Sequence, residues 1–352
     1  MLNYTTVINP PDWEQLLSGW LDAPPCQSER WARLKAHYGY ESLRLAVLDS
    51  DGLPLAMGQL LRRRLPLIRR HWLYCPYGPL WKSDHPLALE QWLAALKEHD
   101  FASRAAVLTI EPRLLEGDEA AEILPELGFR RGTQDVQPRG SLWLDLTKSE
   151  EELFAGLEKR TRYNVGLAER RGVEITLANN EAGVDTFYEL LEETMGRQRF
   201  LAHDQKYFRR VWEAFGPEQA DLLLASFEGE PTAGVFLLYS GRSAYYVYGA
   251  STRRHSKHKG AQLLQWRALL RAKERGAEFY DFWGAPVDPQ PDHPLYGVYQ
   301  FKKGFGGRHI ALIGAQDLTL SAFGGWSWRV GLPLLRKTRN LLVRGRTADV
   351  LD

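Results

Sequence analysis

Several features are missing or scarce in this 352-residue sequence, and each absence excludes a class of protein. Only two cysteines are present, Cys26 and Cys75, so we expect neither a disulfide framework nor a CxxC zinc site. No apolar run reaches the ~18–20 residues of a membrane-spanning helix. The N-terminus also lacks the basic segment and apolar core of a secretory signal. We therefore expect a cytoplasmic protein with reduced cysteines.

An excess of charge of one sign is also missing. The sequence has 45 Lys and Arg against 44 Asp and Glu, a net charge of +1, which disfavours a protein that binds nucleic acid over its whole surface. Two features of the charged residues are nevertheless uneven. Arg outnumbers Lys by 33 to 12, which suits anion recognition but also follows from codon bias or thermal adaptation. Residues 321–352 carry a net charge of +4, and the basic stretch 336–346 fits contact with tRNA or an anionic membrane, or a solvated terminal helix.

Length and hydrophobic periodicity predict two domains of mixed structure. Helices are expected at residues 88–99, 149–171, 184–196, 205–215 and 259–275. Strands are expected at residues 42–49, 53–65, 141–146, 220–227, 231–240, 243–251 and 308–315, with a loop or short turn at 301–307. Each half reads as helices followed by a strand meander, then a helix and a strand. We therefore predict an α/β (α+β) fold built from two copies of one architecture.

Motifs of common enzyme classes are absent, among them GxSxG, HExxH, GxxxxGK[ST] and a strand-linked GxGxxG. Four segments instead combine aromatic, glycine and basic residues. The first, residues 158–175, has five cations that suit a polyanion such as tRNA or a diphosphate, although charge alone favours a solvated helix surface. The second, residues 193–208, places arginines beside a Gly and a Phe, which fits either an anion site or a helix C-terminus with solvated arginines.

The third and fourth segments are strongly aromatic. In residues 243–251, strand alternation places Tyr246 and Tyr248 on one face and Tyr245 on the other, a pattern that fits core packing better than a binding surface. In residues 280–307, Lys302 and Lys303 lie between two phenylalanines. A lysine held against aromatic rings near a strand end is suited to stabilise a developing oxyanion.

The order and spacing of RTRYNVGLAERRGVEI, YYVYGAS, YDFWG and LYGVYQFKKGFGG resemble the Fem family (FemABX-type) of tRNA-dependent peptidyltransferases. The resemblance implies two tandem GNAT-like (acyl-CoA N-acyltransferase-like) domains that face each other across a cleft. We expect the first domain at residues 1–144 plus 318–352 and the second at 145–317, with the C-terminal segment packed on the first. Residues 150–200 leave no room for the helical hairpin that some family members insert, so the compact form is expected.

The resemblance also implies the activity, which is transfer of an amino acid from aminoacyl-tRNA to a side-chain amine of a peptidoglycan precursor. The acceptor is UDP-MurNAc-pentapeptide or the lipid-linked precursor, and the latter would suit peripheral contact with the inner face of the membrane. No metal and no cofactor is implied, and we expect a monomer. The ester of the donor is already activated, so alignment of two substrates and oxyanion stabilisation suffice without a covalent intermediate.

Site residues follow from the family motifs. The precursor-binding lysine resembles Lys35, and its partner arginine resembles Arg197, three residues before Phe200, with Arg199 as the alternative. Lys35 and Arg197 would hold the diphosphate of the precursor, one from each domain. The loop tyrosine before a Gly-Pro pair resembles Tyr77.

The remaining site residues lie in the second domain. The strand tyrosines of the family resemble Tyr246 and Tyr248, and its Phe-Lys pair resembles Phe301 and Lys302. The resemblance implies that Lys302 stabilises the tetrahedral intermediate as its catalytic residue. No residue qualifies as a general base.

Two alternatives remain open. One is an acyl-CoA-dependent GNAT N-acyltransferase acting on an amine, but residues 253–264, where the pyrophosphate loop Q/RxxGxG/A should lie, match it only at Gly260. The other is a non-catalytic protein that holds an anionic ligand in its cleft.

Overall fold

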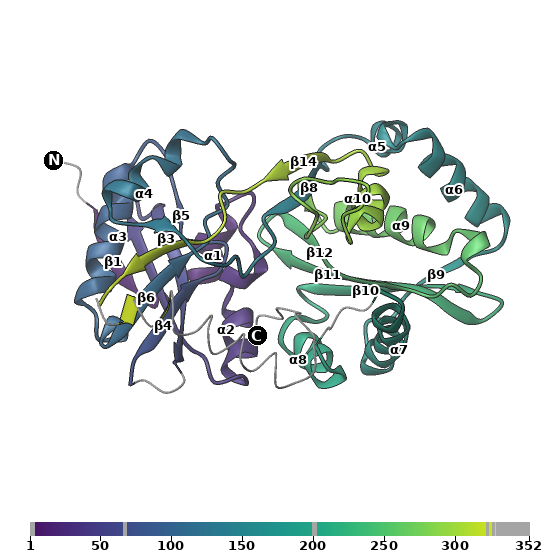
Figure 1. The fold of residues 1–352 in the computed structure, drawn as a ribbon. Helices are drawn as coiled ribbons and strands as arrows, with labels where there is room; N and C mark the ends of the chain where they lie inside the picture. Colours follow the sequence, from purple (N-terminus) through teal and green to yellow (C-terminus); the bar gives the residue numbers. More distant parts are fainter. Residues whose placement is uncertain (1–3, 66–68, 199–202, 322–323, 326–327, 329–352) are drawn as a thin grey trace. The chain divides into compact units, whose positions relative to one another are not determined.

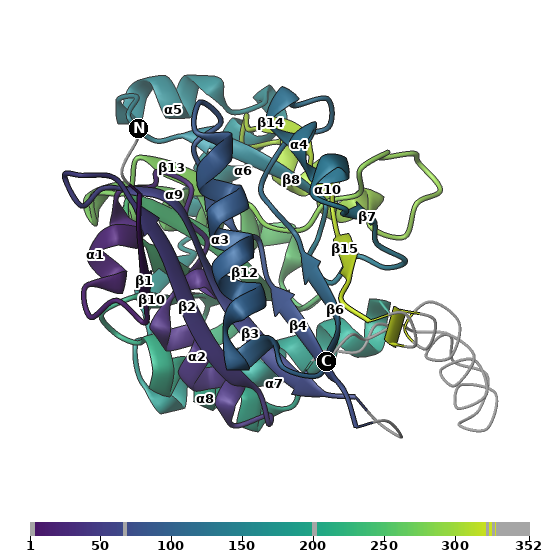
Figure 2. The same ribbon diagram turned by 90° about the vertical axis from the view of Figure 1, so that its left-hand side faces the viewer.

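The computed structural model of the chain describes residues 4–65, 69–198, 203–321, 324–325 and 328 (Figures 1 and 2). The chain divides into two compact units. The first comprises Met1–Gly19, Cys26–Arg139 and Ala311–Asp352, and the second comprises Trp20–Pro25 and Gly140–Ile310. The chain thus passes between units at 139/140 and 310/311, a few residues before the expected boundaries, and the short segment Trp20–Pro25 belongs to the second unit. The basic stretch 336–346 lies outside the described residues.

The first unit is built on a mixed sheet with the strand order β1-β2-β3-β4-β6-β15-β7, and β5 pairs with β3. Its strands are β1 (Thr5–Ile8), β2 (Glu41–Leu48), β3 (Pro54–Arg64), β4 (His71–Cys75), β5 (Leu80–Trp81), β6 (Ala105–Ile110), β7 (Arg130–Arg131) and β15 (Gln316–Thr319). Its helices are α1 (Trp13–Ser18), α2 (Glu29–Ala36), α3 (Pro86–Glu98) and α4 (Ile123–Glu126). Strands β4 and β6 run parallel, with α3 in the connection between them.

The second unit has a sheet of order β14-β8-β13-β12-β11-β10-β9. Its strands are β8 (Gly140–Asp145), β9 (Glu174–Leu177), β10 (Ala220–Phe227), β11 (Glu230–Ser240), β12 (Ser243–Ser251), β13 (Phe279–Asp281) and β14 (Arg308–Ala311). Its helices are α5 (Glu150–Gly156), α6 (Lys159–Arg170), α7 (Glu181–Gln198), α8 (Gln205–Phe215), α9 (Gly260–Glu274) and α10 (Tyr296–Lys303). Strands β12 and β13 run parallel, with α9 in the connection.

The two units repeat one order of elements, as predicted. A meander of three antiparallel strands leads through a helix to a parallel fourth strand, as β2-β3-β4-α3-β6 in the first unit and β10-β11-β12-α9-β13 in the second. Strand β15 pairs with β6, so residues 316–319 belong to the sheet of the first unit, and most of the expected C-terminal segment lies outside the described residues. The α/β prediction is therefore confirmed. In the described part of the chain, α6, β9 and α7 follow α5 without an inserted helical hairpin.

Three local predictions were wrong. The helix expected at 149–171 is divided into α5 and α6, because Leu157 and Glu158 are extended and the Arg162 guanidinium donates to the carbonyls of Ala155 and Leu157. The loop expected at 301–307 begins within a helix, because residues 301–303 are the end of α10, where Phe301 packs against the core of the second unit. Residues 304–307 form the expected turn. The strand expected at 308–315 ends early, and β14 and β15 belong to different sheets.

A β-bulge in β12 decides where two of the predicted site tyrosines lie. Tyr246 pairs with Leu237 and Tyr248 with Phe236, so Val247 is the extra residue. Because Leu237 and Phe236 point to opposite faces, so do the tyrosines, and the prediction that they share a face was wrong. Tyr246 packs against the core on the α9 side. Tyr248 lies 5.0 Å from the Phe208 ring, and the hydroxyls of Tyr207 and Tyr248 are 2.9 Å apart.

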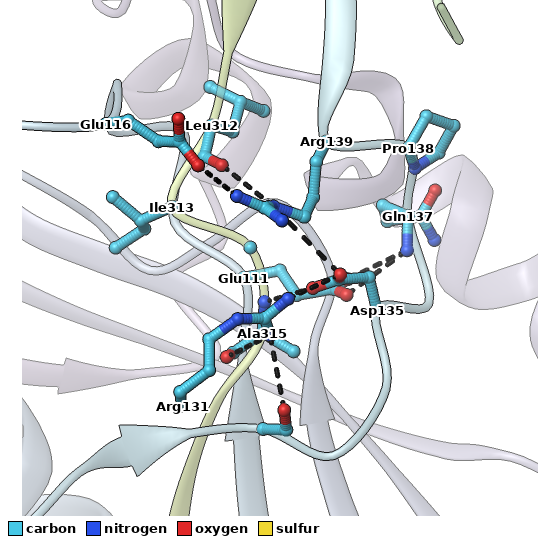
Figure 3. A network of polar contacts seen from close by, with 12 residues as sticks. Glu111, Glu116, Arg131, Asp135, Gln137, Pro138, Arg139, Leu312, Ile313 and Ala315 are labelled. Carbon is cyan, nitrogen blue, oxygen red and sulfur yellow. Dashed lines mark hydrogen bonds and ion pairs between the residues drawn. The ribbon is translucent and has the colours of Figure 1, made fainter. Parts of the chain in front are cut away.

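The segments by which the chain leaves and rejoins the first unit are tied to each other within that unit (Figure 3). Arg139 exchanges backbone and side-chain hydrogen bonds with Leu312, and its guanidinium pairs with Glu116. Asp135 accepts from the Ala315 N–H at 2.8 Å and pairs with Arg131. These contacts hold residues 131–139 and 312–315 side by side.

The buried Glu111 side chain stabilises the same region. Its side chain is 2 % exposed, and it accepts hydrogen bonds from the Tyr74 hydroxyl and from the N–H groups of Val136 (2.6 Å) and Gln137 (3.2 Å). Burial raises the pKa of this carboxyl to about 7, although the three donors oppose the shift.

We predict that Gly249→Ala destabilises the second unit and disturbs Tyr246. A Cβ at position 249 would lie 1.8 Å from the Tyr246 hydroxyl, so the tyrosine must move. We expect a loss of about 1–3 kcal/mol of unfolding free energy, measured by denaturant titration. Gly297→Ala in α10 is the matched control, because no atom lies within 4 Å of its Cβ, and it should be neutral or stabilising. Equal effects of the two variants would contradict the prediction.

A second prediction concerns pH. The native Glu111 carboxyl keeps its proton up to about pH 7, whereas the unfolded carboxyl loses it near pH 4.5. The unfolded state therefore binds fewer protons between these values, and stability falls as pH rises from about 5 to 7, by up to ~3 kcal/mol. In Glu111→Gln this part of the fall should disappear, whereas Glu116→Gln, at a half-exposed carboxyl of the same region, should retain it. Urea titrations between pH 5 and 8 measure both, and a Glu111→Gln profile parallel to that of the unmodified protein would refute the assignment.

Candidate active site

Lys302 is a buried amine at the end of α10. Its side chain is 7 % exposed, and its Nζ donates hydrogen bonds to the carbonyls of Trp283 and, at 2.7 Å, Gly284. The Nζ also lies 5.3 Å from the centre of the Tyr246 ring, which is a cation–π distance. An ammonium has three N–H donors, so the two carbonyls leave one donor for a bound group.

The carbonyls that receive Lys302 are positioned by the end of β13. Asp281 is buried and accepts hydrogen bonds from the Trp283 N–H at 2.8 Å, from Trp143 Nε1 at 3.1 Å and from the Ser141 hydroxyl. Trp283 has a left-handed backbone (φ 50°), which is uncommon outside glycine and is stabilised here by the Asp281 contact. The turn after β13 thus directs two successive carbonyls at one lysine.

Burial sets the charge state of this lysine. Removal from water lowers the pKa of Lys302 to about 7, although the nearby Asp281 carboxylate opposes the shift. Near neutral pH the amine therefore exists as a mixture of ammonium and neutral forms. Strongly shifted amines of this kind are concentrated at functional sites.

The residues around Lys302 explain the aromatic and glycine-rich run in the sequence. Phe301 packs against the core and meets Phe305 edge to face at 5.3 Å. Gly304 lets α6 approach, since a Cβ there would lie 2.3 Å from the Thr161 hydroxyl. The run therefore holds the end of α10 against the sheet and the start of α6.

Lys35 lies in the first unit, in the last turn of α2. It is half-buried, and its Nζ lies 5.3 Å from the Trp31 ring and 6.0 Å from the Tyr40 ring. Arg63 approaches the Tyr40 ring to 5.0 Å and donates to the Tyr40 hydroxyl at 3.0 Å. Tyr40 therefore lies against two cations, an arrangement compatible with an anionic ligand. Sequence reasoning selected Lys35 but missed Arg63, which the register of β3 places here.

Tyr77 is also in the first unit but is almost fully buried. Its hydroxyl donates to the Pro138 carbonyl at 2.6 Å, and the Arg113 guanidinium lies 5.2 Å from its ring. These contacts join the loop that follows β4 to the segment that Glu111 anchors. A role of Tyr77 in substrate binding stays a prediction.

The predicted residues therefore do not all lie together. Lys302, Phe301 and Tyr246 come together in the second unit, whereas Tyr248 lies on the opposite face of the same sheet. Lys35 and Tyr77 belong to the first unit. Arg197 is in the last turn of α7, and Arg199 lies outside the described residues.

The sequence did not single out Asp281, which fixes the turn that receives Lys302, or Glu111, which supports residues 136 and 137. Both are acids at or just after a strand, a position that indicates a buried carboxyl only when the surrounding sheet is known. Within the described residues, no group of three or more His, Cys, Asp or Glu side chains could hold a metal ion. None of the helices described there is long and apolar enough to cross a membrane.

Comparison with known proteins places this geometry in context. Residues 157–303 match the family model described as an acetyltransferase (GNAT) domain. The lipid II:glycine glycyltransferase of Staphylococcus saprophyticus is 26 % identical over 368 residues, covering 84 % of this chain and 88 % of that protein.

Two solved structures share the fold. FemX superposes with a TM-score of 0.83 at 23 % identity, covering 96 % of this chain and 99 % of that one. A tandem GNAT protein from the clavulanic acid biosynthesis pathway gives a TM-score of 0.52 at 15 % identity, covering 91 % and 99 %. The chain therefore has the tandem GNAT fold, and over most of its length it is similar to FemX and to the lipid II:glycine glycyltransferases.

Proposed function

We propose that this protein transfers an aminoacyl group from aminoacyl-tRNA to an amine of the lipid-linked peptidoglycan precursor, and so builds the interpeptide bridge. It is an aminoacyltransferase. The observation that carries the proposal is the extent of the match to the staphylococcal lipid II:glycine glycyltransferase, which covers 84 % of this chain and 88 % of that protein. The name of that relative favours the lipid-linked acceptor over the soluble one and makes glycyl-tRNA the first donor to test.

The reaction needs little from the protein beyond alignment and charge stabilisation. The acceptor amine attacks the ester carbonyl, a C–N bond forms, and the C–O bond to the terminal ribose breaks. The amine loses a proton and the ribose oxygen gains one. As the tetrahedral intermediate forms, negative charge develops on the former carbonyl oxygen, and protonated Lys302 can donate its remaining N–H to that atom.

The chemistry of the acceptor fits the cations of the first unit. A lipid-linked precursor carries a diphosphate, and Lys35 with Arg63 beside Tyr40 offers two cations to such a group. Binding of this group by Arg197 or Arg199 stays a prediction. Peripheral contact with the membrane and a monomeric state stay predictions.

Transfer can be tested directly. The purified protein is incubated with the lipid-linked precursor and with one aminoacyl-tRNA at a time, glycyl-tRNA first, in the absence of CoA. We expect mass spectrometry to detect a precursor heavier by one aminoacyl residue. The soluble UDP-MurNAc-pentapeptide in a parallel reaction reports the acceptor preference. If no aminoacyl-tRNA gives a product with either acceptor, the proposed function fails.

The match to an acetyltransferase domain favours one second candidate, an acyl-CoA-dependent N-acyltransferase. The same reaction with acetyl-CoA in place of aminoacyl-tRNA distinguishes the two functions. Acyl transfer from CoA, with none from tRNA, would establish the second candidate.

Lys302→Met should abolish most of the activity without unfolding the protein. Methionine retains much of the packing volume but cannot donate a hydrogen bond, and loss of one oxyanion donor costs about 10²–10³ in kcat. Because burial disfavours the ammonium, the variant should melt at the same temperature or higher. Lys303→Met, at the exposed neighbouring lysine, should change neither property. Full turnover by Lys302→Met would exclude the oxyanion role.

The pH profile provides an independent test of the protonated form. Below pH 7, the rate should rise tenfold per pH unit as the acceptor amine loses its proton. Above pH 7, Lys302 also loses its proton, so the profile should flatten. In Lys302→Met the residual rate should continue to rise through pH 7. A break near pH 7 that persists in the variant would assign it to another group.

A further inference from the structure

The solvent-facing side of α6 carries cations along its length. Lys159 and Arg160 in the first turn, Arg170 in the last turn and Arg171 just after it are all exposed. Tyr163, 62 % exposed, lies between them. The apolar side chains of α6 are instead buried in the core of the second unit. The exposed side therefore combines cations with one accessible aromatic ring.

The loop between β12 and α9 extends this charged surface. The Arg171 guanidinium donates to the Lys257 carbonyl at 2.5 Å, which joins the end of α6 to residues 253–259. Arg253, Arg254 and Lys257 are exposed there. The loop is held in place by the imidazole of His258, which stacks 3.7 Å above the Phe227 ring. We call the exposed cations of α6 and of this loop, together with Tyr163, the α6 strip.

Within the two segments of the strip, cations outnumber acidic side chains. Residues 159–171 contain five cations and one acid, Glu169, and that acid is paired with Arg267 at 2.9 Å. Residues 253–259 contain four cations and no acid, and Arg254 pairs with Glu230 of the adjacent strand. The strip thus carries a strong local positive charge on a chain of net charge +1.

The other end of the strip adjoins the Lys302 helix. The Glu158 N–H donates to the Gly304 carbonyl at 2.9 Å, and Gly304 is two residues from Lys302. The twelve residues of α6 span about 18 Å at 1.5 Å per residue. A polyanion on the strip would therefore extend from beside the reacting centre to the loop at 253–259.

We propose that the α6 strip binds the sugar-phosphate backbone of the donor tRNA beside its aminoacylated 3′ end. This proposal rests on the proposed function, because it names the surface on which that donor lies. Exposed Lys and Arg side chains neutralise phosphates, and Tyr163 offers a ring on which an unpaired base can stack. A membrane surface fits less well, since an interfacial helix needs an apolar side toward the lipid and that side of α6 is buried.

Binding is tested with uncharged total tRNA as the probe. In Arg160→Gln/Arg170→Gln, two exposed cations of the strip are removed. We expect about tenfold weaker binding and a salt dependence of log K that is less steep by about two. Lys82→Gln/Lys97→Gln removes two exposed cations of the first unit and is the matched control. The proposal fails if the strip variant and the control variant bind tRNA with equal affinity and equal salt dependence. It also fails if the strip variant binds tRNA normally but no longer binds anionic phospholipid vesicles.

Transfer kinetics separate this proposal from the proposed function. The strip variant should have a higher KM for aminoacyl-tRNA and an unchanged rate with an aminoacylated CCA trinucleotide, which is too short to cover the strip. An equal loss with both donors would assign Arg160 and Arg170 to the reacting centre and overturn the proposal. If the unmodified protein transfers from no donor yet binds tRNA through the strip, the proposed function fails and the binding surface stands.

Discussion

Burial of the Lys302 amine is the constraint on which the candidate site depends. Removing an ammonium from water is costly, and the second unit offsets this cost with two carbonyls, an aromatic ring and a nearby carboxylate. Each compensating group needs its own support, from the Asp281 contact that fixes the turn after β13 to the close packing of Gly304 on α6. The result is an amine whose pKa lies near 7 and whose position is set by several separate elements.

The duplicated architecture places a buried carboxyl at the same point in each unit. Glu111 follows β6 and Asp281 ends β13, and these strands occupy equivalent positions in the repeated order. Each carboxyl accepts at least one backbone N–H and at least one side-chain donor. In the first unit the carboxyl holds the segment that leads out of the unit, whereas in the second it shapes the turn that receives Lys302. A buried carboxyl at this position thus supports an outgoing segment in one unit and a turn in the other.

Much of the fold could be predicted from hydrophobic periodicity and from the Gly and Pro residues that end helices and strands. The helices α3, α8 and α9 and the strands β2, β3, β10, β11 and β12 agree with the sequence to within one or two residues at most ends, because their apolar spacing and flanking Gly or Pro residues are unambiguous. The wrong predictions occur where side-chain or tertiary contacts outweigh local preference. Examples are the break between α5 and α6, the helical form of α10 and the separation of β14 from β15. In each case a contact from a segment distant in sequence, or across a turn, decides the local conformation.

Amino-acid sequence alone determined the two-domain α/β architecture and the Phe301–Lys302 pair, because alternation, spacing and composition are local properties. It also placed the cations of residues 159–171 on a helix, predicted too long at 149–171, without indicating which of its sides is exposed. Tertiary structure alone decided that Tyr246 faces Lys302 while Tyr248 does not, since one unpaired residue in β12 reverses the side-chain alternation. The tertiary structure also lowered the pKa of Lys302 and raised that of Glu111. Desolvation depends on what surrounds a group in space and not on its neighbours in the chain.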